Sequence, residues 1–231
     1  MDERTKTFIK SVFPASVPIY RRIRKVRYAL NILTPGMEEI FTEIYLNNSW
    51  ADAESVSGSG STCARTVVIR RELPALLVSV GAKSLLDAPC GDFNWMQHVD
   101  LGEVEYLGAD VVRELIARNR SMYGGKGRDF SLLDITSDEP PRADLILCRD
   151  CFIHLSFKHI RAAISNFKKS DSTFLLATTH TTVRENTDIA SGEGRYVNLQ
   201  LPPCNFPEPL RRITENHELG KNLGLWRLED L

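Results

Sequence analysis

The sequence predicts an α/β fold with a doubly wound, mostly parallel β-sheet. From Lys83 to His180, short strand-like segments alternate with segments of helical spacing, which is typical of strand–helix–strand units. The strand-like segments are apolar on both faces, as expected for parallel strands that are covered on both sides. Residues 210–219 and 223–231, joined by the sequence GKN, instead predict an antiparallel hairpin at the sheet edge.

The order of the elements follows from these patterns. The predicted parallel strands are the five apolar segments 85–89, 104–110, 128–136, 143–149 and 173–180. Helical spacing covers residues 111–121 and 158–167, and the sequence from about Asn94 is compatible with a further helix. Upstream, residues 38–47 and 66–80 predict helices, the second with a kink or restart at Pro74, and residues 55–62 predict a Gly/Ser loop.

The first 36 residues differ from the rest of the chain. Between Arg4 and Gly36 there are eight basic residues and no acidic one, and apolar residues spaced by three and four from Ile19 to Leu30 predict a basic amphipathic helix. Such a helix is either solvated at the edge of the domain or binds an anionic partner: a phosphate-bearing substrate, a membrane surface or RNA. We expect residues 1–65 to form a helical extension with the Gly/Ser loop, and residues 66–231 the main domain.

The composition excludes several classes of protein. Lys and Arg total 29 and Asp and Glu total 30, whereas a dedicated nucleic-acid binder usually carries a basic excess. The sequence contains no run of about 18 apolar residues, so it predicts no transmembrane helix. Pro14 and Pro18 interrupt the apolar stretch that a signal peptide needs. Five scattered cysteines favour a reduced, cytoplasmic location. Because Cys148 and Cys151 have no second pair, we expect buried thiols and no metal site.

Three acidic residues, Asp87, Asp110 and Asp134, follow successive predicted strands. Their spacings of 23 and 24 residues each fit one strand–helix–strand unit. The three carboxylates are therefore expected at one edge of the sheet, where doubly wound folds bind ligands. A dinucleotide would need G-x-G-x-x-G after the first strand. This chain has only Gly91 there, and Asp87 and Asp92 would repel a diphosphate, so the pattern favours a cationic cofactor.

The string DAPCGDFNWM, which begins at Asp87, resembles motif I of class I S-adenosylmethionine-dependent methyltransferases. With SGSGST upstream and CRDCFIHLS downstream, it is similar to a group of small bacterial methyltransferases, largely of unassigned substrate and some associated with surface-polysaccharide synthesis. The resemblance implies a seven-stranded Rossmann-like sheet and S-adenosylmethionine as the cofactor. It further implies that Asp87 and Gly91 lie near the methionine part, that Asp110 accepts hydrogen bonds from the ribose hydroxyls, and that Leu133 and Asp134 hold the adenine. The predicted cofactor site also includes Pro89, Asp92, Trp95 and Arg149.

Methyl transfer to a hydroxyl needs alignment and a group that removes a proton. His154 follows the fourth predicted strand, and the ordinary pKa of histidine suits a general base. Asp150 lies four residues earlier, so it is expected to orient His154, to abstract a proton itself, or to pair with Arg149. His180, at the end of the strand 173–180, is the competing base.

Residues 181–209 predict a long loop where a helix would normally follow the fifth strand. A loop of this length in a compact domain is usually functional, so we expect a lid or an acceptor pocket, with stacking faces from Tyr196 and Phe206. The predicted hydrogen-bond donors to the acceptor are Arg184, Asn186, Arg195 and Asn198.

Together these features predict an S-adenosylmethionine-dependent methyltransferase that transfers a methyl group to a polar small-molecule or saccharide acceptor, at oxygen. Two alternatives stay open. One is a methyltransferase acting on RNA or protein, which the basic N-terminus favours. The other is a protein that binds S-adenosylmethionine without catalysis.

Overall fold

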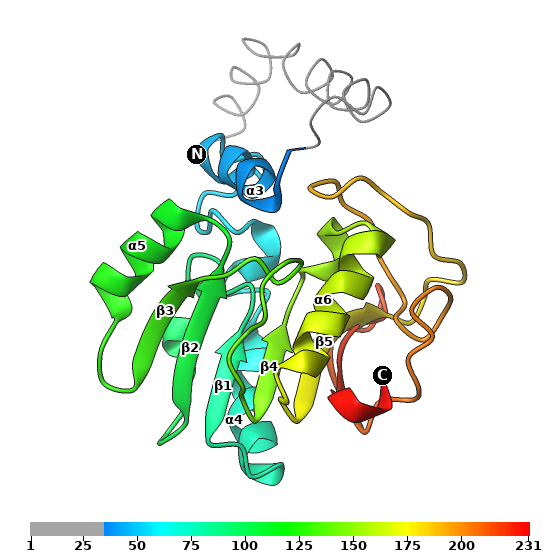
Figure 1. Ribbon diagram of the computed structural model, residues 1–231. Coiled ribbons are helices and arrows are strands. Elements are labelled where there is room, and N and C mark those ends of the chain that lie inside the picture. Colours follow the sequence, from blue (N-terminus) through cyan, green and yellow to red (C-terminus); the bar gives the residue numbers. More distant parts are fainter. Residues whose placement is uncertain (1–34) are drawn as a thin grey trace. The chain divides into compact units, whose positions relative to one another are not determined.

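The protein folds around a seven-stranded mixed sheet with the strand order β3-β2-β1-β4-β5-β7-β6 (Figure 1). This computed structural model describes residues 35–231, so the predicted basic amphipathic helix lies outside the described residues. The sheet confirms the predicted fold class, because β1 to β5 are parallel and β7 runs antiparallel to both β5 and β6. The strands are β1 (Ser84–Asp87), β2 (Glu105–Asp110), β3 (Arg128–Leu132), β4 (Leu145–Cys148), β5 (Phe174–His180), β6 (Arg211–Asn216) and β7 (Lys221–Arg227).

The order of the strands reverses at β1. β2 and β4 pair with opposite sides of β1, so the connections that leave β1 and β4 diverge and leave room for a ligand at the carboxyl ends of these strands. Every residue of β4, and every residue of β5 after Phe174, is buried. Their apolar runs therefore form the centre of the sheet, as expected for parallel strands covered on both faces.

Helices and loops cover both faces of the sheet and form two apolar cores. On one face α4 (Val67–Ser79) and α5 (Arg113–Tyr123) pack against the strands, and on the other α6 (Phe157–Lys169) does so. Residues of α3 (Met37–Leu46) join the same apolar cluster as α6. Pro74 lies inside α4 without ending it. The buried residues of α4 recur at the spacing of a single helix face: Ile69, Leu73, Leu76 and Leu77.

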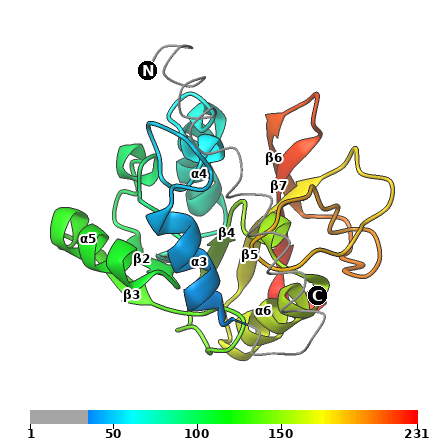
Figure 2. The same ribbon diagram turned by 90° about the horizontal axis from the view of Figure 1, so that it is seen from above.

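Helix α3 belongs to the core of the main domain. Met37, Ile40 and Ile44 are buried on one side of α3 and share an apolar cluster with Leu133, beyond the end of β3. Figure 2 shows α3 lying across the carboxyl ends of the strands. The compact unit runs from Met37 to Leu231, so it takes in residues 37–65, which were expected to belong to the N-terminal extension.

The helix expected from about Asn94 does not form, and Met96–His98 is a single 3₁₀ turn. Phe93 has a positive φ of 60°, which interrupts a right-handed helical path. Phe93, Trp95 and Leu101 are all buried, although no single helix face could hold these three positions. This segment therefore buries its apolar side chains through turns and not through a helix.

Residues 181–210 form the long loop that the sequence predicts after β5. Val197 and Leu199 of this loop pack into the core. Phe206, expected to stack on the acceptor, is instead buried edge-on against the ring of Trp226, with ring centroids 5.2 Å apart. The Trp226 indole N–H donates to the Pro207 carbonyl at 2.8 Å. The loop thus covers the sheet in place of a helix.

The C-terminal hairpin forms, but its turn is shifted relative to the expectation. β7 begins at Lys221, so Lys221 and Asn222 lie in the strand rather than in the turn. Gly220 closes the turn, because it has a φ of 57° and its N–H donates to the His217 carbonyl at 3.1 Å. This shift pairs Lys221 with His180 at the carboxyl end of β5.

Replacing Trp226 with alanine is expected to destabilise the protein by about 3–5 kcal/mol, because a cavity replaces a buried ring. The side chain is 1% exposed and holds the 181–210 loop through both a ring contact and a hydrogen bond. Urea denaturation measures the free energy of unfolding. Leu210→Ala, on the same loop and 55% exposed, is the control and should change this free energy by about 0.5 kcal/mol or less. Equal stability of the two variants would contradict the assignment of Trp226 as the anchor of the loop.

Candidate functional site

A cavity of about 430 Å³ opens at the carboxyl edge of the sheet. Its walls come from the ends of β1, β2, β4 and β5, from the β6–β7 hairpin, and from residues between 41 and 65. A second cavity of about 80 Å³ adjoins it beside the end of β3. The two cavities share the lining residues Phe41, Trp50, Pro89, Asp110, Asp150 and His154.

Asp110, at the end of β2, lines both cavities. Its carboxylate accepts hydrogen bonds from the N–H groups of Gly91 at 3.1 Å and Val112 at 3.0 Å, and it retains lone pairs for further donors. Gly91 is required at this turn, because it has a φ of 56° and a Cβ there would lie 2.3 Å from the Ser57 hydroxyl oxygen. Burial raises the pKa of the Asp110 carboxyl to about 6, although the backbone N–H groups oppose the shift.

Asp87 and Asp134 lie on either side of Asp110 along this edge. The Tyr106 hydroxyl donates to the Asp87 carboxylate at 2.8 Å, and burial raises the pKa of Asp87 to about 7. Asp134 accepts from the N–H and the hydroxyl of Thr136, at 2.8 and 2.7 Å. Asp87 lines the larger cavity, whereas Asp134 and Leu133 line only the smaller one. The structure therefore places the three acidic positions along one continuous hollow.

Asp92 has a different role from the expected contact with a cofactor. Its carboxylate accepts from the Ser55 hydroxyl at 2.8 Å, from the Val56 N–H at 2.9 Å and from the Asn94 N–H at 3.2 Å. Its own N–H donates to the Ser57 hydroxyl at 2.9 Å. These bonds commit Asp92 to fastening the Gly/Ser loop onto the turn that follows β1. Asp92 therefore shapes the cavity wall from behind.

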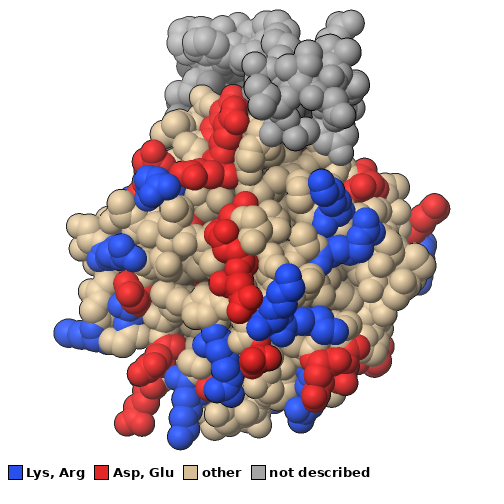
Figure 3. Space-filling view, viewed as in Figure 1, with Lys and Arg blue, Asp and Glu red and all other residues tan. Residues whose placement is uncertain are grey.

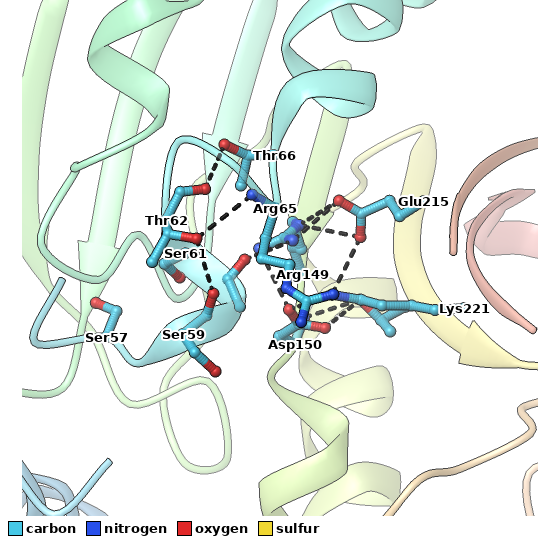
Figure 4. Close-up of polar contacts among 12 residues, drawn as sticks. Ser57, Ser59, Ser61, Thr62, Arg65, Thr66, Arg149, Asp150, Glu215 and Lys221 are labelled. Carbon is cyan, nitrogen blue, oxygen red and sulfur yellow. Dashed lines mark hydrogen bonds and ion pairs between the residues drawn. The ribbon is translucent and has the colours of Figure 1, made fainter. Parts of the chain in front are cut away.

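Four largely buried charged residues form a cluster in the wall of the larger cavity (Figure 4), and we call them the charge cluster: Arg149, Asp150, Glu215 and Lys221. Arg149 donates to the Glu215 carboxylate through Nε at 3.0 Å and Nη2 at 2.9 Å, and to the Gly60 carbonyl at 2.8 Å. The Lys221 ammonium lies 2.6 Å from Asp150 Oδ2 and 3.2 Å from Glu215 Oε2. Arg149 Nη1 lies 3.2 Å from Asp150 Oδ2, which closes the ring of contacts.

The charge cluster sets the protonation of Asp150 and occupies Arg149. Burial alone would raise the pKa of Asp150, but Arg149 and Lys221 beside it reverse the shift and hold the pKa at about 2. The Arg149 guanidinium, expected to contact the cofactor, instead points its N–H groups at protein oxygens and lies 5.4 Å from the centre of the Trp95 ring. Of the predicted cofactor residues, Trp95 and Arg149 therefore line the cavity as one packed pair.

Glu215 and Lys221 were not recognised from the sequence. The GKN string placed Lys221 in a turn, and Glu215 occupies a strand whose neighbouring residues are polar. Only the antiparallel pairing of β7 with β5 brings Lys221 to the carboxyl end of the parallel strands. The feature of the sequence that could have pointed to them is a charged residue close to the turn in each hairpin strand, Glu215 in one and Lys221 in the other.

His154 lines both cavities, and one of its ring nitrogens has no hydrogen-bond partner among residues 35–231. Its Nδ1 lies 2.8 Å from the Glu193 carbonyl oxygen. Because a carbonyl can only accept, Nδ1 carries the proton and Nε2 retains its lone pair. The Trp50 ring packs beside the imidazole with centroids 5.0 Å apart. Burial lowers the pKa of His154, so the ring is neutral near pH 7.

The expected contact between Asp150 and His154 is not what holds the imidazole. No helical turn joins them, because Asp150 has a φ of 53° and Phe152–His154 is a 3₁₀ turn. The Asp150 carboxylate instead meets Lys221, Arg149 and the Thr178 hydroxyl, the last at 3.2 Å. Of the three roles considered for Asp150, the structure supports pairing with Arg149.

His180, the competing base, lies beneath an aromatic ring. Tyr196 stacks on it with centroids 4.4 Å apart and an interplanar angle of 20°. His180 Nδ1 is buried without a hydrogen-bond partner among residues 35–231. Burial lowers the pKa of His180 to about 4. The His180 imidazole is thus both covered by a ring and weakly basic.

The side chains expected to bind the acceptor mostly hold the 181–210 loop together. The Asn186 side chain binds the backbone of Asn198, its amide N–H donating to the Asn198 carbonyl at 2.8 Å and its amide oxygen accepting from the Asn198 N–H at 2.9 Å. Arg195 donates to the carbonyls of Phe152 at 2.6 Å and Leu155 at 2.7 Å. Arg184 is exposed and lines neither the larger nor the smaller cavity. None of these four side chains lines the larger cavity, and Tyr196 is the residue of this loop that reaches it.

Two further observations concern metals and membranes. Among the described residues, no three His, Cys, Asp or Glu side chains gather in a way that could hold a metal ion. From Pro35 to the C-terminus, no helix combines the length and the apolar character needed to cross a bilayer. All five cysteines are free thiols, with Cys148 and Cys151 buried. The expected cytoplasmic location stays a prediction.

Comparisons with known proteins identify the fold. No protein-family model and no curated protein sequence matches the chain. Among solved structures, human N-acetylserotonin methyltransferase in complex with SAM matches with a TM-score of 0.59 and 13% identity, covering 84% of this chain and 60% of that one. A 1,6-didemethyltoxoflavin-N1-methyltransferase from Burkholderia thailandensis, with bound 1,6-didemethyltoxoflavin and S-adenosylhomocysteine, matches with a TM-score of 0.58 and 14% identity, covering 82% and 87%.

A third solved structure, TnmH, matches with a TM-score of 0.55 and 14% identity, covering 71% of this chain and 55% of that one. The chain thus spans less than two thirds of the length of TnmH and of the human enzyme. At these identities the likeness shows the fold. The architecture of this chain is the Rossmann-like fold of class I S-adenosylmethionine-dependent methyltransferases.

The raised pKa of Asp110 predicts a pH-dependent stability. The folded protein binds this proton more tightly than the unfolded chain, so Asp110 favours folding below its ordinary pKa of 3.8 and loses that contribution as pH rises through about 6. Between pH 8 and pH 5, the wild-type protein should gain about 1–1.5 kcal/mol of unfolding free energy relative to Asp110→Asn. Urea denaturation of both proteins at both pH values measures this gain. Titration of His154 and His180 is common to both proteins and cancels, and that of Asp87 cancels in large part because Asp110 is the smallest of the causes that shift its pKa. A pH-independent difference would therefore contradict the raised pKa of Asp110.

Proposed function

We propose that this chain is an S-adenosylmethionine-dependent methyltransferase that methylates a polar small molecule of the saccharide class at an oxygen atom. One observation carries the proposal. Asp110, a buried carboxylate with lone pairs to spare, lies where a larger and a smaller cavity adjoin at the carboxyl edge of a methyltransferase-type sheet. That arrangement suits a ligand with a diol between two unequal parts.

The residues present fit the cofactor. In this proposal the smaller cavity, lined by Leu133 and Asp134, takes the adenine, and Asp110 accepts from the ribose hydroxyls. Asp87 and Gly91 line the larger cavity, where the amino-acid part would lie. Carboxylates in these positions suit a cofactor that carries positive charge and no phosphate. When bound, the cofactor supplies a methyl group on a positively charged sulfur.

His154 serves as the general base in this proposal. The Glu193 carbonyl holds the proton on Nδ1, so Nε2 accepts the proton of an acceptor hydroxyl. Packing against Trp50 fixes the orientation of the ring. The lowered pKa leaves the imidazole unprotonated at neutral pH, and a general base must be unprotonated to act.

The rest of the larger cavity favours a polar small acceptor. Its lining combines the aromatic rings of Tyr45, Trp50 and Tyr196 with short hydroxyl side chains of the Gly/Ser loop. Aromatic faces with a few placed polar groups are typical of sites for small polar ligands. The acceptors named for the first two structural neighbours described above, N-acetylserotonin and 1,6-didemethyltoxoflavin, are small molecules too, which supports this size class.

An RNA acceptor finds less support on the face of the molecule that Figure 3 shows. On the face shown in Figure 3, Lys and Arg side chains are interspersed with Asp and Glu side chains. A nucleic-acid partner would favour a single-signed basic field. The RNA alternative therefore rests on the basic residues before Gly36, which lie outside the description.

Isothermal titration calorimetry should show that S-adenosylhomocysteine binds with a micromolar Kd. Asp110→Ala is expected to weaken this binding about 10- to 100-fold, because the cofactor hydroxyls lose a charged acceptor. Glu139→Ala, at an exposed carboxylate that lines neither of the two cavities, should leave the Kd unchanged. If NADH or ATP binds and S-adenosylhomocysteine does not, the proposed function fails.

His154→Ala is expected to lower the maximal methylation rate by about 100-fold or more while leaving cofactor affinity within about threefold, because a base acts only in the transition state. Release of S-adenosylhomocysteine with a panel of hydroxylated sugars measures the rate, and calorimetry measures the affinity. His180→Ala should show the smaller loss of rate. Near-normal turnover of His154→Ala together with a large loss in His180→Ala would move the base to the end of β5.

A further inference from the structure

One basic residue on the wall of the larger cavity has no acidic partner. Three basic residues line this cavity, and the charge cluster already neutralises two of them, Arg149 and Lys221. The third, Arg65, is exposed and makes no ion pair with any described residue. Its positive charge is therefore the one on this wall that remains uncompensated within residues 35–231.

Two serine hydroxyls on the same wall are also without a partner in the described part of the chain. Residues 57–61 all line the larger cavity. The hydroxyl of Ser57 is bound to Asp92, whereas Ser59 and Ser61 engage only their own backbone atoms. The Ser59 carbonyl accepts from the Thr62 hydroxyl, the Ser61 carbonyl accepts from the Asn94 amide, and the Ser61 N–H donates to the Gly58 carbonyl. Figure 4 draws Ser59, Ser61 and Arg65 around the charge cluster. This wall thus offers unused hydrogen-bond donors.

The loop that carries these serines is held from behind. The Gly60 carbonyl accepts from Arg149 at 2.8 Å and the Ser61 carbonyl accepts from Asn94 at 3.0 Å. A Cβ at Gly60 would lie 2.9 Å from Asp150 Oδ2, so the loop packs tightly on the charge cluster. Because the Gly60 and Ser61 carbonyls are engaged, the side-chain groups that remain for a ligand are the hydroxyls of the two serines and the guanidinium of Arg65. This set of donors matches a carboxylate or phosphate.

We propose that Ser59, Ser61 and Arg65 form a subsite for the anionic group of a ligand bound in the larger cavity. The inference rests on the proposed function, because the cavity is the proposed site of methyl transfer. Two sources carry such a group: the amino-acid carboxylate of the cofactor, and a carboxylate or phosphate on the acceptor. The cofactor carboxylate fits the subsite better than an acceptor group does. Ser57 packs directly on Gly91, which brings the loop beside the turn assigned to the amino-acid part of the cofactor.

Calorimetry with two nucleosides separates the sources. S-adenosylhomocysteine carries the amino-acid carboxylate, and 5′-methylthioadenosine lacks it. If the subsite holds the cofactor, Arg65→Gln and the double variant Ser59→Ala/Ser61→Ala should each weaken S-adenosylhomocysteine at least tenfold. The same variants should change the Kd of 5′-methylthioadenosine less than twofold. Arg118→Gln, at an exposed arginine of α5 outside both cavities, is the matched control and should change neither.

If the subsite instead holds the acceptor, Arg65→Gln should leave the affinity for S-adenosylhomocysteine unchanged. Inorganic phosphate, titrated into protein saturated with S-adenosylhomocysteine, should then bind the wild type and bind Arg65→Gln at least tenfold more weakly. An Arg65→Gln protein with unchanged affinity for both S-adenosylhomocysteine and phosphate overturns the subsite. A wild-type protein that binds neither nucleoside refutes the proposed function instead, and phosphate titration of the free protein still tests the subsite.

Discussion

Four buried charges that neutralise one another hold the cavity of this protein in shape. Arg149 and Asp150 follow β4, whereas Glu215 and Lys221 come from the C-terminal hairpin. Removing an ion from water costs several kcal/mol, which attraction offsets only when each charge has well-placed partners. Each of the four therefore requires the others, and Arg149 also requires the Gly60 carbonyl. The end of β4, the hairpin and the Gly/Ser loop are thereby fixed around one hollow.

The same hollow depends on loops that take the place of helices. After β1 the chain makes a 3₁₀ turn, and after β5 it runs through residues 181–210 before β6. Such segments need internal hydrogen bonds, because their buried backbone has no helical partners. Asp92, Arg195 and the pair formed by Asn186 and Asn198 supply those bonds. Polar residues that look available for ligands are in this way used to build the walls of the site.

The two histidines at the strand ends show how a partner decides the chemistry of a side chain. A carboxylate beside an imidazole would raise its pKa, whereas a carbonyl fixes the tautomer without adding a full charge. His154 has the carbonyl of Glu193 and remains neutral with a free Nε2. Among residues 35–231, Nδ1 of His180 has no carboxylate or carbonyl as a hydrogen-bond partner, and the Tyr196 ring covers the imidazole. Asp150, four residues before His154, is meanwhile engaged by Lys221.

By itself the sequence determined the layered α/β fold, the parallel strands and the gathering of Asp87, Asp110 and Asp134 at one edge, because these depend on local periodicity and on the fixed direction of parallel strands. Only the tertiary structure decided which polar groups meet. The pairing of β7 with β5 brought Lys221 to Asp150, and packing of the Gly/Ser loop engaged Asp92 behind the cavity wall. Such contacts join residues 36 to 71 positions apart, and no local pattern in a sequence encodes them.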